Sequence, residues 1–129
     1  MTTELWMLLA AAGLQWALIM GASTPRLLAN GIPWSLGNRD VPSKEVPPWA
    51  ERMQRASNNM MENLPIFAVA VLVVHAADAS TETSALGATI FLVARLVHAG
   101  FFVAGVKVLR SGAWAVSIAG LFMVVSVLF

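Results

Sequence analysis

Arg55, Asn59 and Glu62 lie four and three residues apart, which puts three polar side chains on one face of a helix. Further polar residues surround them, including Arg52 and Asn63. Arginine binds carboxylates and glutamate binds an ammonium group through charge-assisted hydrogen bonds. This stripe therefore has the chemistry to hold an anionic, peptide-like ligand that carries both kinds of group.

A second stripe consists of Arg95, His98 and Phe102, again at spacings of three and four. If the two stripes face each other, Glu62 and Arg95 can form an ion pair, with Asn59 as a polar contact between the helices. This structural interpretation stands beside the ligand-binding one. The additional polar residues favour a ligand, because one ion pair does not require them.

The elements that carry these stripes are expected to cross a membrane. The chain has 129 residues, of which 58% are hydrophobic and only 12% charged, and a spanning helix needs about 20 mostly apolar residues. We predict one all-α domain over residues 1–129, an integral membrane four-helix bundle. The spans are expected at about 5–22, 49–77, 85–106 and 113–129, with a long loop over 24–46 and a basic turn over 107–112.

Membrane depth constrains the polar stripes. An unpaired arginine or glutamate inside a bilayer costs about 3 kcal/mol or more, so each stripe should face the bundle interior or a hydrated cavity. The absence of cysteine excludes disulfides, cysteine-based zinc sites and a protein thiol nucleophile, and we expect no metal site. A net charge of +1 without a phosphate-binding glycine loop argues against nucleic acid. A cleaved signal peptide is disfavoured, because no basic segment precedes the first span.

The distribution of charges predicts the orientation. Five basic residues lie in the first loop and the start of the second helix, and two lie in the last turn: Arg26, Arg39, Lys44, Arg52, Arg55, Lys107 and Arg110. The connection between the second and third spans holds only Asp78 and Glu82. By the positive-inside rule, both termini should lie outside, while the first loop and the last turn face the cytoplasm.

Residues 52–67, with the sequence RMQRASNNMMENLPIF, closely resemble the signature of the MAPEG family, membrane-associated proteins in eicosanoid and glutathione metabolism. That signature is Arg-Ala-x-x-Asn-x-x-Glu followed by Pro and Phe. Residues 38–40 resemble a loop of the bacterial branch of the family. Its third-span and last-turn pattern is matched by Arg95, Gly105, Arg110, Ser111 and Trp114.

The resemblance implies a homotrimer of four-helix bundles in a bacterial cytoplasmic membrane, with glutathione as cosubstrate in a cleft between subunits near the cytosolic face. It implies these glutathione-binding residues: Arg52, Arg55, Asn59, Glu62, Asn63, Arg95, His98 and Phe102. It also implies that Arg110 is catalytic and stabilises the thiolate. A nearby positive charge lowers the pKa of a thiol from its usual value of about 8.5.

The implied function is a membrane-bound, glutathione-dependent transferase or peroxidase that acts on lipophilic electrophiles or lipid hydroperoxides. One departure concerns catalysis, because His98 and Phe102 stand where many members have tyrosines. This favours, as an alternative, a non-catalytic membrane protein that binds glutathione or a lipid. A third hypothesis is a small proton-coupled exporter with four spans. Such exporters carry a glutamate in the first span, where this chain has Gln15.

Overall fold

The computed structural model describes all 129 residues and contains helices but no strands. The helices are α1 (Thr3–Asn30), α2 (Ile32–Leu36), α3 (Pro48–Ala76), α4 (Glu82–Ala104) and α5 (Lys107–Ser126). All except the short α2 are long and apolar enough to cross a bilayer. The predicted all-α, multi-pass membrane architecture is therefore confirmed.

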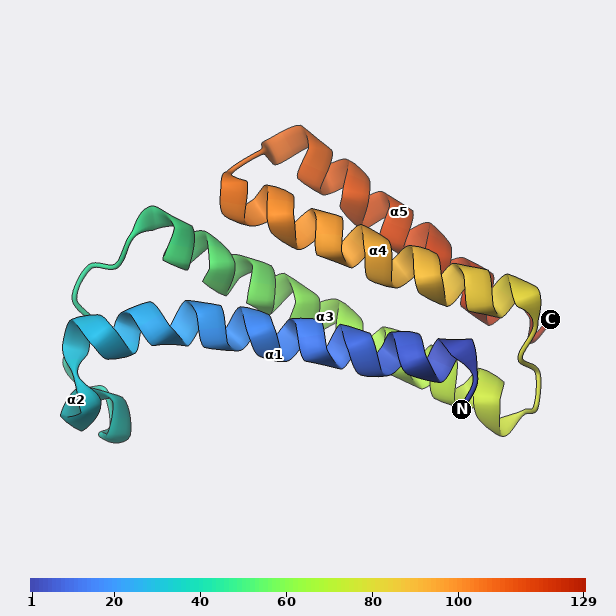
Figure 1. Cartoon of the computed structure of the whole chain (residues 1–129), viewed down its shortest axis with the longest axis horizontal. Helices are drawn as coiled ribbons and strands as arrows, with labels where there is room; N and C mark the ends of the chain where they lie inside the picture. The colour runs from blue at the N-terminus through green and yellow to red at the C-terminus, as the bar shows by residue number, and fades with distance from the viewer.

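The four long helices form two pairs, α1 beside α3 and α4 beside α5 (Figure 1). Both chain termini lie at one end of the bundle, where the two pairs come close together. At the opposite end, which holds α2 and the connection between α4 and α5, the pairs are further apart (Figure 1). The bundle is thus narrow at the end with the termini and wider at the end with α2.

Local sequence signals fix where α4 begins and ends. Thr81 and Ser84 form a capping box: the backbone N–H of Ser84 donates to Oγ1 of Thr81 at 3.3 Å, and that of Thr81 donates to Oγ of Ser84 at 2.8 Å. The helix ends at Gly105, which has a φ of 81° that glycine adopts readily. This left-handed residue lets α5 begin only two residues later, at Lys107.

The expectation of a loop over residues 24–46 is wrong for its first part. Helix α1 continues through Pro25 to Asn30, and α2 follows at once. This part of α1 contacts α3, because Nη2 of Arg26 forms an ion pair with Oε1 of Glu51 at 3.0 Å. A loop without regular structure remains only between α2 and α3.

The expected basic turn over residues 107–112 is also wrong. These residues form the first turns of α5, because Gly105 completes the reversal before Lys107. Arg110 and Ser111 therefore project from a helix rather than from a turn. Their positions are fixed by the packing of α5 on α4.

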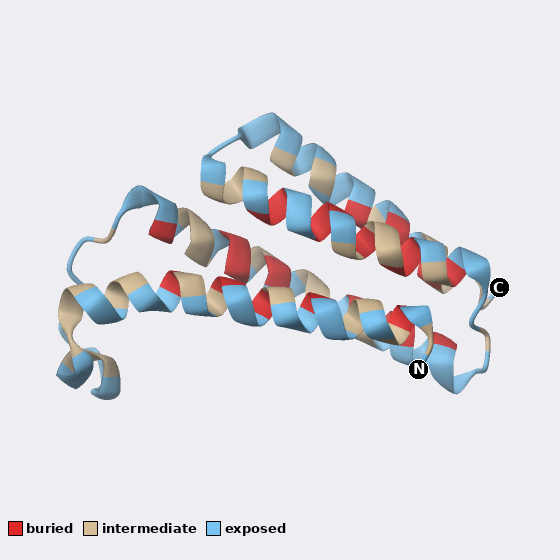
Figure 2. Cartoon of the chain, in the orientation of Figure 1, coloured by how far each residue is buried: buried red, intermediate tan, exposed pale blue.

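Buried residues lie on the sides of the helices that face one another, and exposed residues lie mainly on the outside of the bundle (Figure 2). The rings of Phe67 on α3 and Phe91 on α4 stack with their centroids 3.9 Å apart. Helices α4 and α5 pack closely at Gly87 and Gly120, where a Cβ added to either residue would lie 2.7 Å from the carbonyl oxygen of the other. Small residues permit such close packing between membrane helices, where apolar side chains gain little from leaving lipid.

Candidate functional site

A polar pocket of about 340 Å³ lies at the wider end of the bundle, between α3, α4 and α5. Its lining residues are Asn59, His98, Phe102, Arg110, Ser111 and Trp114. Three of the predicted glutathione-binding residues and the predicted catalytic arginine are among them. Asn59 comes from α3, His98 and Phe102 from α4, and Arg110 from α5, so the pocket depends on the packing of three helices.

Arg110 supplies the positive charge of this pocket. Its guanidinium carbon lies 4.2 Å from the centroid of the Phe102 ring, within the range of a cation–π contact. The Phe102 ring in turn meets His98 edge to face, with centroids 5.6 Å apart. Arg110 is half-buried and forms no ion pair. Its charge is therefore available to an anion in the pocket.

Arg95 is held by neutral groups of α3. Its side chain is 1% exposed, its Nη2 donates to Oδ1 of Asn59 at 2.7 Å, and its Nε contacts Sδ of Met60 at 3.4 Å. The interpretation of Glu62 and Arg95 as an ion pair is wrong for this structure, in which Arg26 and Glu51 form the only salt bridge. The two stripes instead meet through the amide of Asn59.

The outer residues of the first stripe do not enter the pocket. Arg55 and Glu62 are exposed and make no side-chain hydrogen bond, although they share a helical face with Asn59. That face lies at the edge of the bundle, so the half-buried Asn59 reaches α4 while its two neighbours point outward. The predicted grouping of the three on one face is right, but only Asn59 faces the polar pocket.

Arg52 and Asn63 have structural contacts. Nε of Arg52 donates to the carbonyl oxygen of Val103 at 2.7 Å, which ties the start of α3 to the end of α4. Nδ2 of Asn63 donates to the carbonyl oxygen of Asn59 at 2.7 Å, within α3. Neither residue lines the pocket of the single chain.

The remaining lining residues, Ser111 and Trp114, match the last-turn pattern of the family but were not assigned as glutathione-binding residues. Trp114 follows Arg110 by four residues, which puts both on one helical face. That spacing is informative only if residues 107–112 are helical. Because a turn was expected there, the helical spacing of Arg110 and Trp114 was not used in the prediction.

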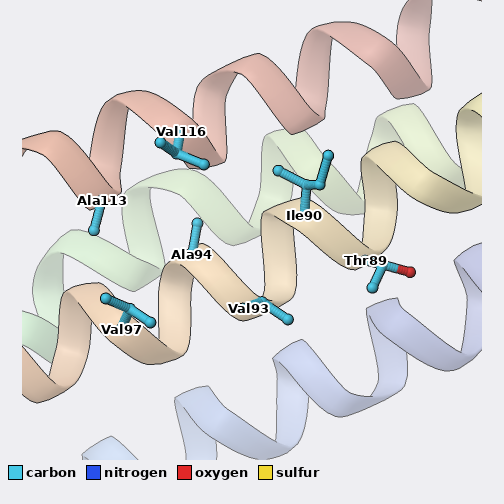
Figure 3. A pocket seen from close by; sticks show the side chains of 7 residues that line it. All are labelled: Thr89, Ile90, Val93, Ala94, Val97, Ala113 and Val116. Carbon is cyan, nitrogen blue, oxygen red and sulfur yellow. The ribbon is translucent and has the colours of Figure 1, made fainter.

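A second pocket, of about 360 Å³, lies on the surface of α4 and α5 and is apolar. Figure 3 shows its lining side chains: Thr89, Ile90, Val93, Ala94, Val97, Ala113 and Val116. Its one hydroxyl, on Thr89, donates to the carbonyl oxygen of Ala85 at 2.9 Å and so is already satisfied. This surface offers contact to hydrocarbon but no group for acid–base or nucleophilic chemistry.

Comparison with known proteins agrees with the architecture. A sequence model of the MAPEG family matches residues 3–129, essentially the whole chain. Neither the curated proteins nor the solved structures gave a match. The chain therefore belongs to the MAPEG family, membrane proteins of eicosanoid and glutathione metabolism.

Proposed function

We propose that this protein is a glutathione-dependent transferase or peroxidase that acts on lipophilic electrophiles or lipid hydroperoxides. The observation that carries the proposal is the polar pocket, where Arg110 shares a wall with Asn59, His98 and Phe102 inside an apolar bundle. Members of the family use glutathione, and such a pocket combines a fixed cation with hydrogen-bonding groups. Substrates dissolved in the bilayer can approach it from the side.

In this proposal glutathione supplies the thiol that the cysteine-free chain lacks. Arg110 stabilises the thiolate, because a positive charge beside sulfur favours the ionised form and lowers the thiol pKa. The released proton passes to water at the mouth of the pocket. The Phe102 ring packs against the guanidinium and holds it in place. The Ser111 hydroxyl, which donates to the carbonyl oxygen of Lys107 at 3.3 Å, can turn to donate to sulfur instead.

The carboxylates and the ammonium group of glutathione are the proposed partners of the remaining site residues. In this assignment Arg52 and Arg55 bind carboxylates, Glu62 binds the ammonium group, and Asn63 adds an amide. The predicted glutathione-binding residue Arg95 is buried and bonded to Asn59, so its proposed contribution is to orient Asn59 in the pocket wall. Arg55 and Glu62 face outward from the single chain, so a ligand that reaches both them and the pocket must lie partly beyond its surface.

We infer that other copies of the chain cover this surface and that the protein is a homotrimer with its ligand clefts between subunits. A charged residue at membrane depth that faces lipid costs about 3 kcal/mol or more, which disfavours leaving Glu62 uncovered. The basic residues gather near the wider end of the bundle, so this end is assigned to the cytoplasm and both termini to the outside. A bacterial cytoplasmic membrane fits this arrangement.

The alternative is a non-catalytic protein that binds glutathione or a lipid. Phe102 favours it, because a phenyl ring cannot donate a hydrogen bond to a thiolate. The contact between Arg110 and that ring favours it as well, since part of the charge is already engaged. The two proposals share the pocket and differ in whether the bound thiol ionises.

A thermal-shift titration of detergent-purified protein with glutathione tests both proposals. Glutathione should raise the melting temperature, and S-methylglutathione, which keeps the carboxylates and the amine, should do so too. Only glutathione should give a thiolate absorbance band near neutral pH if the protein is an enzyme. Native mass spectrometry should show trimers. No shift with either peptide would contradict a glutathione site, and monomers alone would contradict the intersubunit cleft.

A further inference from the structure

Two buried polar atoms in the interior of the bundle have no hydrogen-bond partner within the chain: Oε1 of Gln15 and Nη1 of Arg95. Gln15 is 5% exposed and Arg95 is 1% exposed. One atom is an acceptor and the other a donor, so their requirements are complementary. A buried polar group without a partner costs about 1–3 kcal/mol, and the cost is avoided if the same neighbour satisfies both.

Contacts on α3 bring these two side chains to the same region. Nε2 of Gln15 donates to Oγ of Ser57 at 3.1 Å, and Nε of Arg95 contacts Sδ of Met60 at 3.4 Å. Ser57 and Met60 are three residues apart and both buried, so they lie on one face of α3 with their Cβ atoms about 5–6 Å apart. Gln15 from α1 and Arg95 from α4 therefore approach the same turn of α3.

The register of α1 against α4 agrees with this placement. Near the termini, Oγ of Ser84 on α4 donates to the buried carboxylate of Glu4 on α1. The two helices run in the same direction (Figure 1), and Gln15 and Arg95 each lie eleven residues beyond that contact. At 1.5 Å per residue both are about 16 Å further into the bundle. They are therefore at the same depth.

We propose that Gln15 is a positioning residue for Arg95 and acts through one buried water molecule. The water accepts a hydrogen bond from Nη1 of Arg95 and donates one to Oε1 of Gln15. The Ser57 hydroxyl accepts from Gln15, so its own hydrogen is free to donate to the same water. Three such bonds are typical of a buried water that serves otherwise unsatisfied polar groups.

This bridge links α1 to the polar pocket, although Gln15 does not line it. With Nη1 held by the water and Nε by Met60, the guanidinium of Arg95 is fixed so that Nη2 bonds Asn59. Asn59 is the one residue of α3 that lines the pocket. Gln15 thereby orients a pocket wall through Arg95 without touching the pocket. Only this last step, the effect on ligand binding, rests on the proposed glutathione site.

The test compares Gln15→Met, which keeps the length of the side chain without an acceptor, with Gln15→Glu, which keeps an acceptor. In detergent, Gln15→Met should lower the melting temperature and Gln15→Glu should recover most of that loss. The same Gln15→Met change made in an Arg95→Met background should lower it much less, because the two residues act together. As a control, the losses of melting temperature caused by Gln15→Met and Ser84→Ala should add up in the double variant, since Ser84 lies eleven residues from Arg95 along α4.

Glutathione affinity is the second measurement. A purely structural role of Gln15 would not change this affinity in parallel with the melting temperature. Gln15→Met should weaken binding about fivefold, the size of a typical coupling between neighbouring residues, with rescue by Gln15→Glu. Additive losses in the Gln15 and Arg95 cycle would overturn the proposal. So would a Gln15→Glu protein that melts below Gln15→Met, because an unpaired carboxylate there would be costly. If Arg95→Met does not fold, the Met and Glu variants of Gln15 decide the question alone. Coupling in a protein that does not bind glutathione would support the bridge and contradict the glutathione site.

Discussion

The guanidinium of Arg110 and the ring of Phe102 pack against each other at 4.2 Å, across the connection between α4 and α5. The contact has two consequences. It holds the guanidinium of Arg110, the one free cation of the polar pocket, in position. It also means that this position carries a phenyl ring, where a tyrosine would offer a hydroxyl. Arg110 and Phe102 are therefore the residues whose replacement best separates an enzyme from a binding protein.

Arg110→Ala should raise the apparent pKa of bound glutathione thiol, because the thiolate loses the positive charge beside it. Turnover of a model electrophile near neutral pH should fall roughly 100-fold, as on removal of one positioned charge that stabilises an anion. Affinity for glutathione should change little, since the proposed partners of its carboxylates and amine are other residues. Thiolate absorbance as a function of pH measures the first effect. Arg110→Lys, which keeps the charge, is the control and should retain more activity than Arg110→Ala. Equal rates for the wild type and both variants would exclude a catalytic Arg110.

Phe102→Tyr should increase turnover with little effect on stability. The ring keeps its contacts with Arg110 and His98. Because Phe102 lines the pocket, the new hydroxyl is expected to act as a donor for the thiolate. Steady-state rates and the thiolate band should both rise. Phe102→Leu is the matched control, because it removes the cation–π contact, worth about 1 kcal/mol at a partly exposed site, and should lower both. A tyrosine variant no faster than the wild type would show that the hydroxyl does not reach sulfur.

Glu62→Gln should weaken glutathione binding while leaving the melting temperature of the ligand-free protein nearly unchanged. Glu62 is exposed and does not pair with Arg95, so its charge is not needed to hold the helices together. Isothermal titration and thermal melting measure the two quantities. Glu51→Gln breaks the ion pair that does form, with Arg26. It should cost at most about 1 kcal/mol of stability and leave binding intact. A large loss of stability in Glu62→Gln would contradict this account.

Asn59→Leu should destabilise the bundle by about 2 kcal/mol, because Nη2 of Arg95 then loses its partner in a buried environment. Denaturation in mixed micelles measures the change. Asn59→Asp keeps an acceptor for Arg95 and should be far more stable than Asn59→Leu. Asn63→Ala serves as the matched control, since its amide only bonds a carbonyl oxygen of its own helix. Similar stabilities for Asn59→Leu and Asn63→Ala would mean that Arg95 finds another partner.

Cysteines introduced at Ser43 and Thr83 should react with an impermeant thiol reagent from opposite sides of the membrane. Both residues are exposed, Ser43 in the loop before α3 and Thr83 at the start of α4. The chain has no cysteine of its own, so labelling has no background. Ser43→Cys should label from the cytoplasm and Thr83→Cys from outside. Labelling of both from one side would contradict the proposed crossing of α3.

The sequence predicts the long helices well because each is a continuous apolar segment. It misplaces their ends where a single residue decides the outcome. Pro25 and the glycines nearby suggest a loop, but the segment is helical to Asn30 and its Arg26 pairs with Glu51 on α3. Gly105 completes a reversal in two residues, which no apolar pattern indicates. Tertiary contacts and one backbone conformation determine these boundaries.

The candidate site was also predicted only in part. Helical spacing correctly groups Asn59 with its neighbours on one face, but spacing cannot say which member of a face reaches another helix. The partner of Arg95 is therefore an amide and not the carboxylate of Glu62. Gln15 carried no signal at all, because a lone amide in an apolar span matches no motif. Its proposed role depends on Ser57 of α3 and Arg95 of α4, which are distant from it in the sequence.

The contact between Gly87 and Gly120 limits how the sequence of this protein can change over evolutionary time. At both positions the atoms nearest to an added Cβ include backbone atoms of the opposite helix. A smaller side chain elsewhere cannot make room, so neither position can be rescued by a compensating substitution. Lipid-facing residues of α4 and α5 can diverge freely as long as they stay apolar. Natural variants of this chain should therefore differ widely around these two glycines and retain both.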